Sequence, residues 1–230
     1  MGDSIFGFDT AKSWDYENGY YLTSHPSRMA KAIAHWEIFK KIVNVPGAIV
    51  ECGVFKGASL IRFAAFRELL ENSYSRKIIG FDAFGTFPAT NSPADSQFIE
   101  YFEKSAGGGI PKEDLERVLN RNNFDNVELI KGNILQTLPA YLGKKLQLKI
   151  SLLHIDVDVY DATKLCLEYL FDRVSAGGVI VLDDYGDVDG VTRAVDEFMQ
   201  ARRIDSPILQ NPYYSKPCYI VKGKGYTNTR

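Results

Sequence analysis

The chain has 230 residues, 45% of them hydrophobic, and a net charge of −2 at pH 7. This length fits one α/β domain with an insertion, and the near-neutral charge argues against binding to nucleic acid or to an anionic membrane surface. The 3 cysteines lack a C-x-x-C spacing, and no stretch approaches the roughly 18 apolar residues of a membrane span, so we expect a cytoplasmic protein.

The N-terminal segment, residues 1–25, is rich in aromatic side chains, which disordered chains rarely contain. We therefore expect it to fold as a cover over part of the domain. Pro26 then opens a helix with Ser24 as its N-cap, because proline is favoured at the first position of a helix. Two basic residues of this helix, Arg28 and Lys31, are expected to be solvated.

Apolar runs and helical patterns alternate along the rest of the chain. The predicted strands span residues 48–52, 78–81, 127–130, 150–155 and 179–182, and the predicted helices span 58–70, 162–174 and 191–203. This alternation is typical of an α/β fold with a doubly wound, mostly parallel sheet. Two short strands, near 207–209 and 219–221, are expected to form an antiparallel hairpin at one edge. One domain over residues 1–230 accommodates all these elements.

A long excursion, residues 83–124, separates the second predicted strand from the third. It contains Pro88, Pro93 and the glycine run 107–109, which favour neither helix nor strand, and a short helix is expected only near 112–121. Loops of this length within a compact domain are usually functional lids or disordered. We expect the excursion to be a mobile lid insertion.

Carboxylates follow two of the predicted strands, at the edge where open α/β sheets bind ligands. Asp156 and Asp158 follow one strand, and Asp183 and Asp184 follow the next. Since side chains repeat with a period of two along a strand, Asp156 and Asp158 are expected on one face. Four carboxylates in one crevice require a positive charge, and carboxylate ligands favour a hard cation, Mg²⁺ before Ca²⁺ or Mn²⁺. His154 is expected to be a buried, hydrogen-bonded histidine rather than a ligand.

A glycine turn, residues 51–59, connects the first predicted strand to the next helix. Gly53 and Gly57 would let a nucleotide-like cofactor lie against the backbone, although an ordinary tight turn is the alternative, because the full G-x-G-x-x-G pattern is absent. Asp82, at the end of the next strand, suits hydrogen bonds to two ribose hydroxyls. Since no phosphate-binding motif is present, the pattern indicates a ribose-containing cofactor without phosphate, S-adenosylmethionine.

Several motifs, in this order, resemble those of one known family. They are E-C-G-V-F-K-G, F-D-A-F-G-T-F-P, K-G-N-I-L-Q-T-L-P, L-H-I-D-V-D-V-Y-D-A-T and V-L-D-D-Y. Together they are similar to the macrocin O-methyltransferase (TylF-type) family over about residues 20–200. The resemblance implies a class I methyltransferase fold of the Rossmann-like kind. It also implies Mg²⁺-dependent and S-adenosylmethionine-dependent O-methylation of a sugar or similar polyol.

The resemblance further implies roles for individual residues. The implied metal ligands are Asp156, Asp183 and Asp184, and the implied general base is Asp158. The residues implied to line the cofactor site are Thr23, Ser24, Glu51, Gly53, Gly57, Ser59, Asp82 and Asn133. The expected partners are a small acceptor that contains a sugar and further copies of the chain in a homo-oligomer.

Two other functions stay open from the sequence. The apolar run that ends in Asp156-Val157-Asp158-Val159 resembles the aspartyl-phosphate motif of haloacid-dehalogenase-like phosphatases. That motif should follow the first strand of its domain, however, and here three predicted strands precede it. A non-catalytic binding protein with a methyltransferase fold would share every cofactor feature, and the sequence alone does not separate it from an enzyme.

Overall fold

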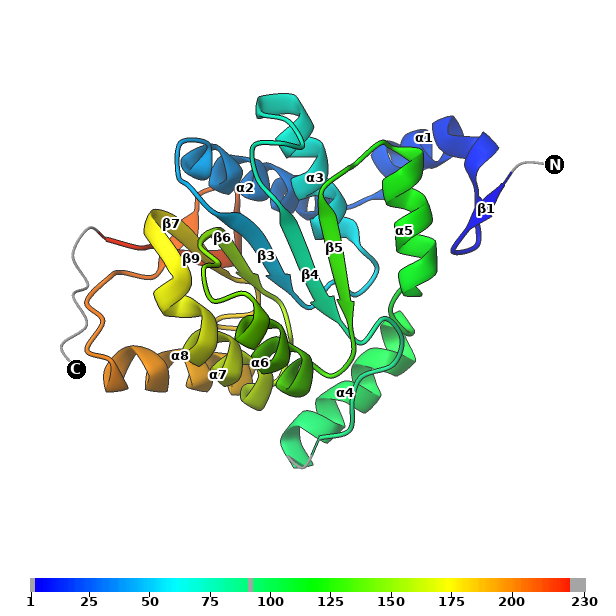
Figure 1. Cartoon of the computed structure of the whole chain (residues 1–230). Helices are drawn as coiled ribbons and strands as arrows, with labels where there is room; N and C mark the ends of the chain where they lie inside the picture. Colours follow the sequence, from blue (N-terminus) through cyan, green and yellow to red (C-terminus); the bar gives the residue numbers. More distant parts are fainter. Residues whose placement is uncertain (1–2, 91–92, 224–230) are drawn as a thin grey trace.

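The computed structural model describes residues 3–90 and 93–223, and this part of the chain folds around a seven-stranded sheet with helices on both faces (Figure 1). The strand order is β5-β4-β3-β6-β7-β9-β8. The first five strands in this order, β5, β4, β3, β6 and β7, run parallel, whereas β9 runs antiparallel to β7 and to β8. The strands are β3 (Ala48–Cys52), β4 (Ile78–Asp82), β5 (Val127–Lys131), β6 (Ile150–Ile155), β7 (Val174–Leu182), β8 (Leu209–Asn211) and β9 (Tyr214–Val221). The predicted mostly parallel α/β sheet with an antiparallel C-terminal hairpin is therefore confirmed.

Two layers of helices bury the two faces of the sheet. Those on one face are α2 (Pro26–Ile42), α3 (Ala58–Leu70) and α5 (Lys112–Arg121), and those on the other are α6 (Ile134–Lys144), α7 (Tyr160–Leu170) and α8 (Asp189–Ala201). Every residue of β3 and of β6 is buried. Strands covered on both faces favour apolar residues at successive positions, which is why both strands are mostly apolar in sequence.

The order in which the chain adds strands to the sheet reverses between β3 and β6. From β3 the chain proceeds to β4 and β5 on one side, and it then crosses over to β6 and β7 on the other side. A crevice forms outside the carboxyl ends of the strands at such a point, and ligands of open α/β sheets bind there. The loops that follow β3 and β6 are the glycine turn and the segment with Asp156 and Asp158.

The N-terminal segment consists of the hairpin β1 (Ser4–Ile5) and β2 (Phe8–Asp9), a 3₁₀ turn (Thr10–Lys12) and α1 (Ser13–Thr23). No side chain of α1 is buried, so its aromatic residues do not shield the core of this chain. The prediction of Ser24 as the N-cap of the next helix is wrong by one residue. His25 caps α2, and its Nδ1 accepts a hydrogen bond from the Ser27 amide at 3.3 Å.

The excursion after β4 is mostly helical, contrary to the sequence prediction. Helix α4 (Pro93–Ala106) begins with a proline, and proline fits the first position of a helix because its missing N–H needs no partner there. Helix α5 buries Leu115 and Leu119 against the sheet, so it belongs to the core. The Gly109 amide donates to the Gly85 carbonyl at 2.8 Å, and the glycine run thereby joins two parts of the excursion.

Helix α6 was not among the predicted helices either, and it contains Pro139 in its interior. Its buried positions Leu138 and Leu142 are four residues apart and face the sheet. Within the described residues, no helix combines the length and apolar character needed to cross a bilayer.

Candidate active site

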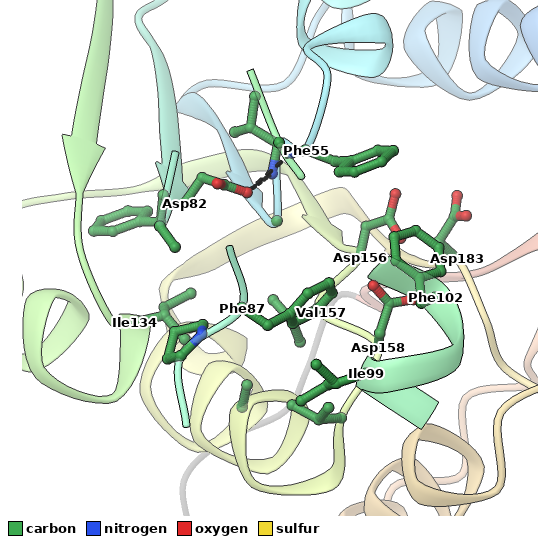
Figure 2. A pocket seen from close by; sticks show the side chains of 18 of the residues that line it. Phe55, Asp82, Phe87, Ile99, Phe102, Ile134, Asp156, Val157, Asp158 and Asp183 are labelled. Carbon is green, nitrogen blue, oxygen red and sulfur yellow. Dashed lines mark hydrogen bonds between the residues drawn. The ribbon is translucent and has the colours of Figure 1, made fainter. Parts of the chain in front are cut away.

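A cavity of about 470 Å³ opens at the carboxyl ends of β3, β4, β6 and β7 (Figure 2). Its wall includes Asp82 on one side and the carboxylates Asp156, Asp158 and Asp183 on the other. Side chains of α4, among them Phe102, lie over it. The crevice expected from the topology is therefore present, and it brings the glycine turn and the acidic strand ends together.

Three carboxylates converge in this cavity. Asp156, Asp158 and Asp184 each place an oxygen within 4.8 Å of the others. The reason differs from the predicted one, since β6 ends at Ile155 and no longer imposes an alternation of faces. Asp158 instead has a φ of 61°, in the left-handed region that is costly for a residue with a side chain. A tight turn after the strand, and not the strand itself, thus directs Asp158 toward Asp184.

The fourth carboxylate, Asp183, has other partners. Its Oδ2 accepts a hydrogen bond from Lys31 Nζ at 2.6 Å, and its Oδ1 lies 3.3 Å from His154 Nε2. Lys31 comes from α2 and was expected to be solvated, so that interpretation is wrong. One positive charge that the four carboxylates require is therefore supplied by the protein itself.

His154 is fully buried and hydrogen-bonded, as predicted. Its Nδ1 lies 3.2 Å from Glu51 Oε1, and the same Glu51 oxygen accepts a short hydrogen bond from the Ser59 hydroxyl. Although burial opposes a charged imidazole, hydrogen bonds to Asp183 and Glu51 raise the pKa of His154 to about 10. An imidazolium donates from both ring nitrogens, which matches a histidine held between two carboxylates.

The remaining carboxylates hold their protons more tightly than usual. Burial, followed by the charges of Asp183 and Asp184, raises the pKa of Asp156 well above its ordinary value. Burial and Asp184 do the same to the pKa of Asp158. Asp183 is the exception, because its bonds to His154 and Lys31 outweigh burial and lower its pKa. Among the described residues, Asp156, Asp158 and Asp184 thus lack a positive partner of the kind that Asp183 has in Lys31.

The donor set fits a hard divalent cation. Asp156 and Asp184 supply only oxygen ligands, which Mg²⁺ and Ca²⁺ prefer, and Asp158 lies within reach of both. Asp184 Oδ2 is buried and has no hydrogen-bond partner among the described residues. A buried carboxylate oxygen without a donor is costly, and a cation at this position would remove that cost.

Asp82 uses its carboxylate to hold the glycine turn. Its Oδ2 accepts hydrogen bonds from the amides of Val54 at 2.8 Å and Phe55 at 2.9 Å, and its Oδ1 accepts one from Phe84 at 2.5 Å. The bond to Phe55 is drawn in Figure 2. A carboxylate has about four acceptor positions, so Asp82 retains capacity for about one further donor rather than two.

The predicted cofactor residues fall into two groups. Four of them line the cavity: Gly53, Ser59, Asp82 and Asn133. The other four are not among its lining residues: Thr23, Ser24, Glu51 and Gly57. Asn133 also caps α6 by accepting from the Leu135 amide at 2.9 Å. A side chain at Gly53 would meet the Asp156 carbonyl oxygen at 1.7 Å, so this glycine is required by the protein's own backbone.

Several lining residues were missed from the sequence. Arg28, Lys31 and Arg62 supply positive charge, and aromatic side chains of the excursion supply apolar surface. Arg28, Lys31 and His35 are spaced by three and four residues on α2, a pattern that places them on one helix face. That spacing was the available signal, and it indicates a face directed at the acidic strand ends.

The sheet order and the cavity at the reversal point define a class I methyltransferase fold. The crystal structure of the calicheamicin methyltransferase CalS11 shares it with a TM-score of 0.75 and 25% sequence identity, over 92% of this chain and 86% of that chain. The model of the macrocin-O-methyltransferase (TylF) family matches residues 27–213. The chain therefore belongs to the macrocin O-methyltransferase family, as its motifs indicated.

Curated relatives match at lower coverage. A tetracenomycin-C derivative 4'-O-methyltransferase of Streptomyces olivaceus, whose substrate carries a dimethoxy-rhamnosyl group, is 29% identical over 172 residues, 73% of this chain and 63% of that protein. The mycinamicin III 3''-O-methyltransferase of Micromonospora griseorubida is 26% identical over 173 residues, 73% of this chain and 66% of that protein. The chain thus spans less than two thirds of the length of these relatives.

Proposed function

We propose that this chain is an S-adenosylmethionine-dependent and Mg²⁺-dependent O-methyltransferase that acts on a hydroxyl of a sugar-containing small molecule. The observation that carries the proposal is the convergence of Asp156, Asp158 and Asp184 in a cavity that also reaches the glycine turn. Family membership supports methyl transfer, and both curated relatives above are named as O-methyltransferases.

The cavity offers separate regions for the two halves of the reaction. In this proposal the adenosine lies along Gly53, Asp82 and Asn133, and the methyl group points toward Asp156. Asp82 contributes one hydrogen bond to the ribose, since its other acceptor positions hold the glycine turn. Glu51 would support the site indirectly through Ser59, because Glu51 is fully buried and hydrogen-bonded to Ser59 and His154.

The chemistry requires an activated hydroxyl, because a sugar alcohol ionises far above neutral pH. When bound, the cofactor would supply an electrophilic methyl group and Mg²⁺ would lower the pKa of the acceptor hydroxyl. Asp156 and Asp184 would hold the cation. Asp183 would become a further ligand if it released its ion pair with Lys31. Asp158 would take the hydroxyl proton as general base, because it lies beside the carboxylates that would hold the cation.

Helix α4 would complete the site by excluding water. Phe102 packs against Phe55 and Phe87, with ring centroids 5.2 and 5.7 Å apart, so an aromatic surface lies between the cavity and solvent. The part of the predicted lid that could close over a ligand is therefore α4, since α5 is packed in the core. An apolar cover strengthens the electrostatic interactions beneath it.

We retain the homo-oligomer as a proposal. Trp14 is 75% exposed and Leu22 is 84% exposed on α1, and such apolar exposure is typical of a surface that another chain covers. Light scattering of the purified protein tests it, and a monomer at micromolar concentration would contradict it.

A thermal-shift panel tests the proposed function. S-adenosylhomocysteine should raise the unfolding temperature, because a ligand that binds only the folded state stabilises it. Mg²⁺ should add a further shift that the Asp184→Asn variant lacks. Stabilisation by orthovanadate with Mg²⁺, and none by S-adenosylhomocysteine, would favour the phosphatase alternative. A cofactor shift without any effect of the metal would favour a non-catalytic binding protein.

A further inference from the structure

Arg62 is a cavity-lining arginine without an acidic partner. It lies on α3, one turn after Ser59, and its side chain is half-buried. Its Nη1 lies 3.4 Å from His35 Nδ1, and among the described residues no carboxylate oxygen comes within 4.0 Å of its guanidinium. A partly desolvated guanidinium without an anion is costly, which suggests that a ligand supplies the missing charge.

The other buried arginines show that this fold normally satisfies such groups. Arg76 forms an ion pair with Glu71 and donates to the carbonyls of Val43 and Val45. Arg67 donates to three backbone carbonyls and pairs with its neighbour Glu68. Neither lines the cavity, whereas Arg62 does. Among these three arginines, only the one that faces the cavity lacks an ion pair within the described residues.

A second arginine reinforces the same position. Arg28 of α2, an exposed residue, also lines the cavity, and no ion pair joins it to another of the described residues. Burial and the charge of Arg28 lower the pKa of Arg62, so the two guanidinium groups are close enough to repel one another. Two cations that face one cavity would bind an oxyanion, either a carboxylate or a phosphate.

The position of Arg62 selects between these anions. In the proposed binding mode the adenosine occupies the Asp82 side and the sulfur faces Asp156. The amino acid chain of the cofactor must then extend from the sulfur away from both Asp82 and Asp156. The cavity wall formed by Ser59 and Arg62 on α3, with Arg28 of α2 near Arg62, supplies that direction. The α-carboxylate is the one anionic group at that end of the cofactor.

We propose that Arg62, assisted by Arg28, binds the α-carboxylate of the cofactor's amino acid end. This inference rests on the proposed function, because it assumes that S-adenosylmethionine is the cofactor. It assigns a binding role to two basic residues that the sequence motifs do not include. His35 then serves as a positioning residue, since its Nδ1 accepts from the guanidinium and holds it at the cavity wall.

Calorimetry with two product-like ligands tests the assignment. S-adenosylhomocysteine carries the carboxylate, whereas 5'-methylthioadenosine keeps the adenosine and the thioether but lacks the amino acid end. Charged hydrogen bonds are strong, so Arg62→Gln should weaken S-adenosylhomocysteine binding about 10- to 100-fold and leave 5'-methylthioadenosine binding unchanged. Arg28→Gln should show the same selectivity with a smaller loss, and Arg62→Lys should retain part of the affinity. Arg121→Gln, an exposed arginine that does not line the cavity, is the matched control.

The outcomes separate this inference from the proposed function. If the wild-type protein bound neither ligand, the proposed function would be wrong. If wild type bound S-adenosylhomocysteine and Arg62→Gln bound it equally well, only the arginine assignment would be wrong. Equal losses for both ligands would also overturn it, because they would reveal a general effect on the cavity. A further outcome would also overturn the assignment: Arg62→Gln abolishes pyrophosphate binding but leaves the affinity for S-adenosylhomocysteine unchanged. That result would show that Arg62 binds a phosphate of the acceptor and not the cofactor.

Discussion

Lys31 and Asp183, 152 positions apart in the chain, form an ion pair of 2.6 Å between Nζ and Oδ2. The pair links helix α2 to the end of β7 and occupies a carboxylate that the sequence motifs assign to a metal. Lys31 and His154 together neutralise Asp183, whereas the other three aspartates have no comparable partner among the described residues. A metal would thus have to compete with Lys31 for Asp183.

Replacing Lys31 should therefore strengthen cation binding. Lys31→Met keeps the aliphatic stem but removes the ammonium group that repels a cation and holds Asp183. Interactions of this kind near a partly buried site are worth about 1 kcal/mol or more, so Mn²⁺ affinity by calorimetry should rise about 5-fold or more. Lys164→Met, a lysine outside the cavity, is the control. Unchanged or weaker binding in Lys31→Met would show that Asp183 does not exchange partners.

The roles of Asp158 and Asp184 separate by mutation. Asp158→Asn keeps the size of the side chain but cannot accept a proton, so turnover should fall about 10²- to 10⁴-fold while Mg²⁺ affinity is largely kept. Asp184→Asn should weaken Mg²⁺ binding and regain part of its activity in excess Mg²⁺. The exposed Asp205→Asn serves as control. Loss of metal binding in Asp158→Asn, with activity preserved at saturating metal, would contradict both assignments.

Asp82 should matter for folding as well as for cofactor binding. Asp82→Ala leaves the amides of Val54, Phe55 and Phe84 without their acceptor. Since each lost hydrogen bond costs about 1 kcal/mol or more, the free energy of unfolding in urea should fall by about 2–4 kcal/mol without any ligand. A loss below about 0.5 kcal/mol, the size typical of neutral surface substitutions, would restrict Asp82 to cofactor binding.

The raised pKa of His154 should make the stability of the fold depend on pH. Its pKa is about 10 in the fold against an ordinary 6.5, so its contribution is fully present below pH 6.5 and is lost as the pH rises through 10. The free energy of unfolding should therefore fall between these values, and the slope should be shallower in His154→Gln. Parallel slopes in the two proteins would show that His154 is not the group that carries the charge.

Hydrogen exchange distinguishes the two helices of the excursion. Amides of α4 should exchange more slowly after S-adenosylhomocysteine is added, because α4 lies over the cavity. Amides of α5 should be protected with or without ligand, since Leu115 and Leu119 are buried in the core. Equal, ligand-independent protection in both helices would contradict a closing role for α4.

The parts of the fold that the sequence predicted well are those that local pattern determines. The strands 48–52 and 150–155 and the helix 58–70 have the bounds read from the sequence, because their apolar periodicity matches their burial. Helix α4 was missed because Pro93 was interpreted as unfavourable to a helix, although a proline at a helix start is favourable. Helix α6, which contains Pro139 in its interior, was not among the predicted helices.

In the candidate site, too, only the features set by local sequence pattern were predicted. The strand ends indicated Asp156 and Asp184 correctly as neighbours, because parallel strands end at one edge of the sheet. Lys31 and Arg62 could not be recognised from local pattern, since their roles arise from two helices that pack over the acidic strand ends. The assignment of individual aspartates to metal and base stays a prediction.

The central claim is methyl transfer from S-adenosylmethionine to a sugar hydroxyl with the help of a divalent cation. The most direct measurement incubates the protein with methyl-labelled S-adenosylmethionine and a panel of glycosylated small molecules, with Mg²⁺ or with a chelator. We predict a labelled methyl ether on a sugar of at least one acceptor, lost in the chelator, restored by Mg²⁺ and nearly absent with Asp158→Asn. Label transfer that persists undiminished in the chelator and in Asp158→Asn would contradict it.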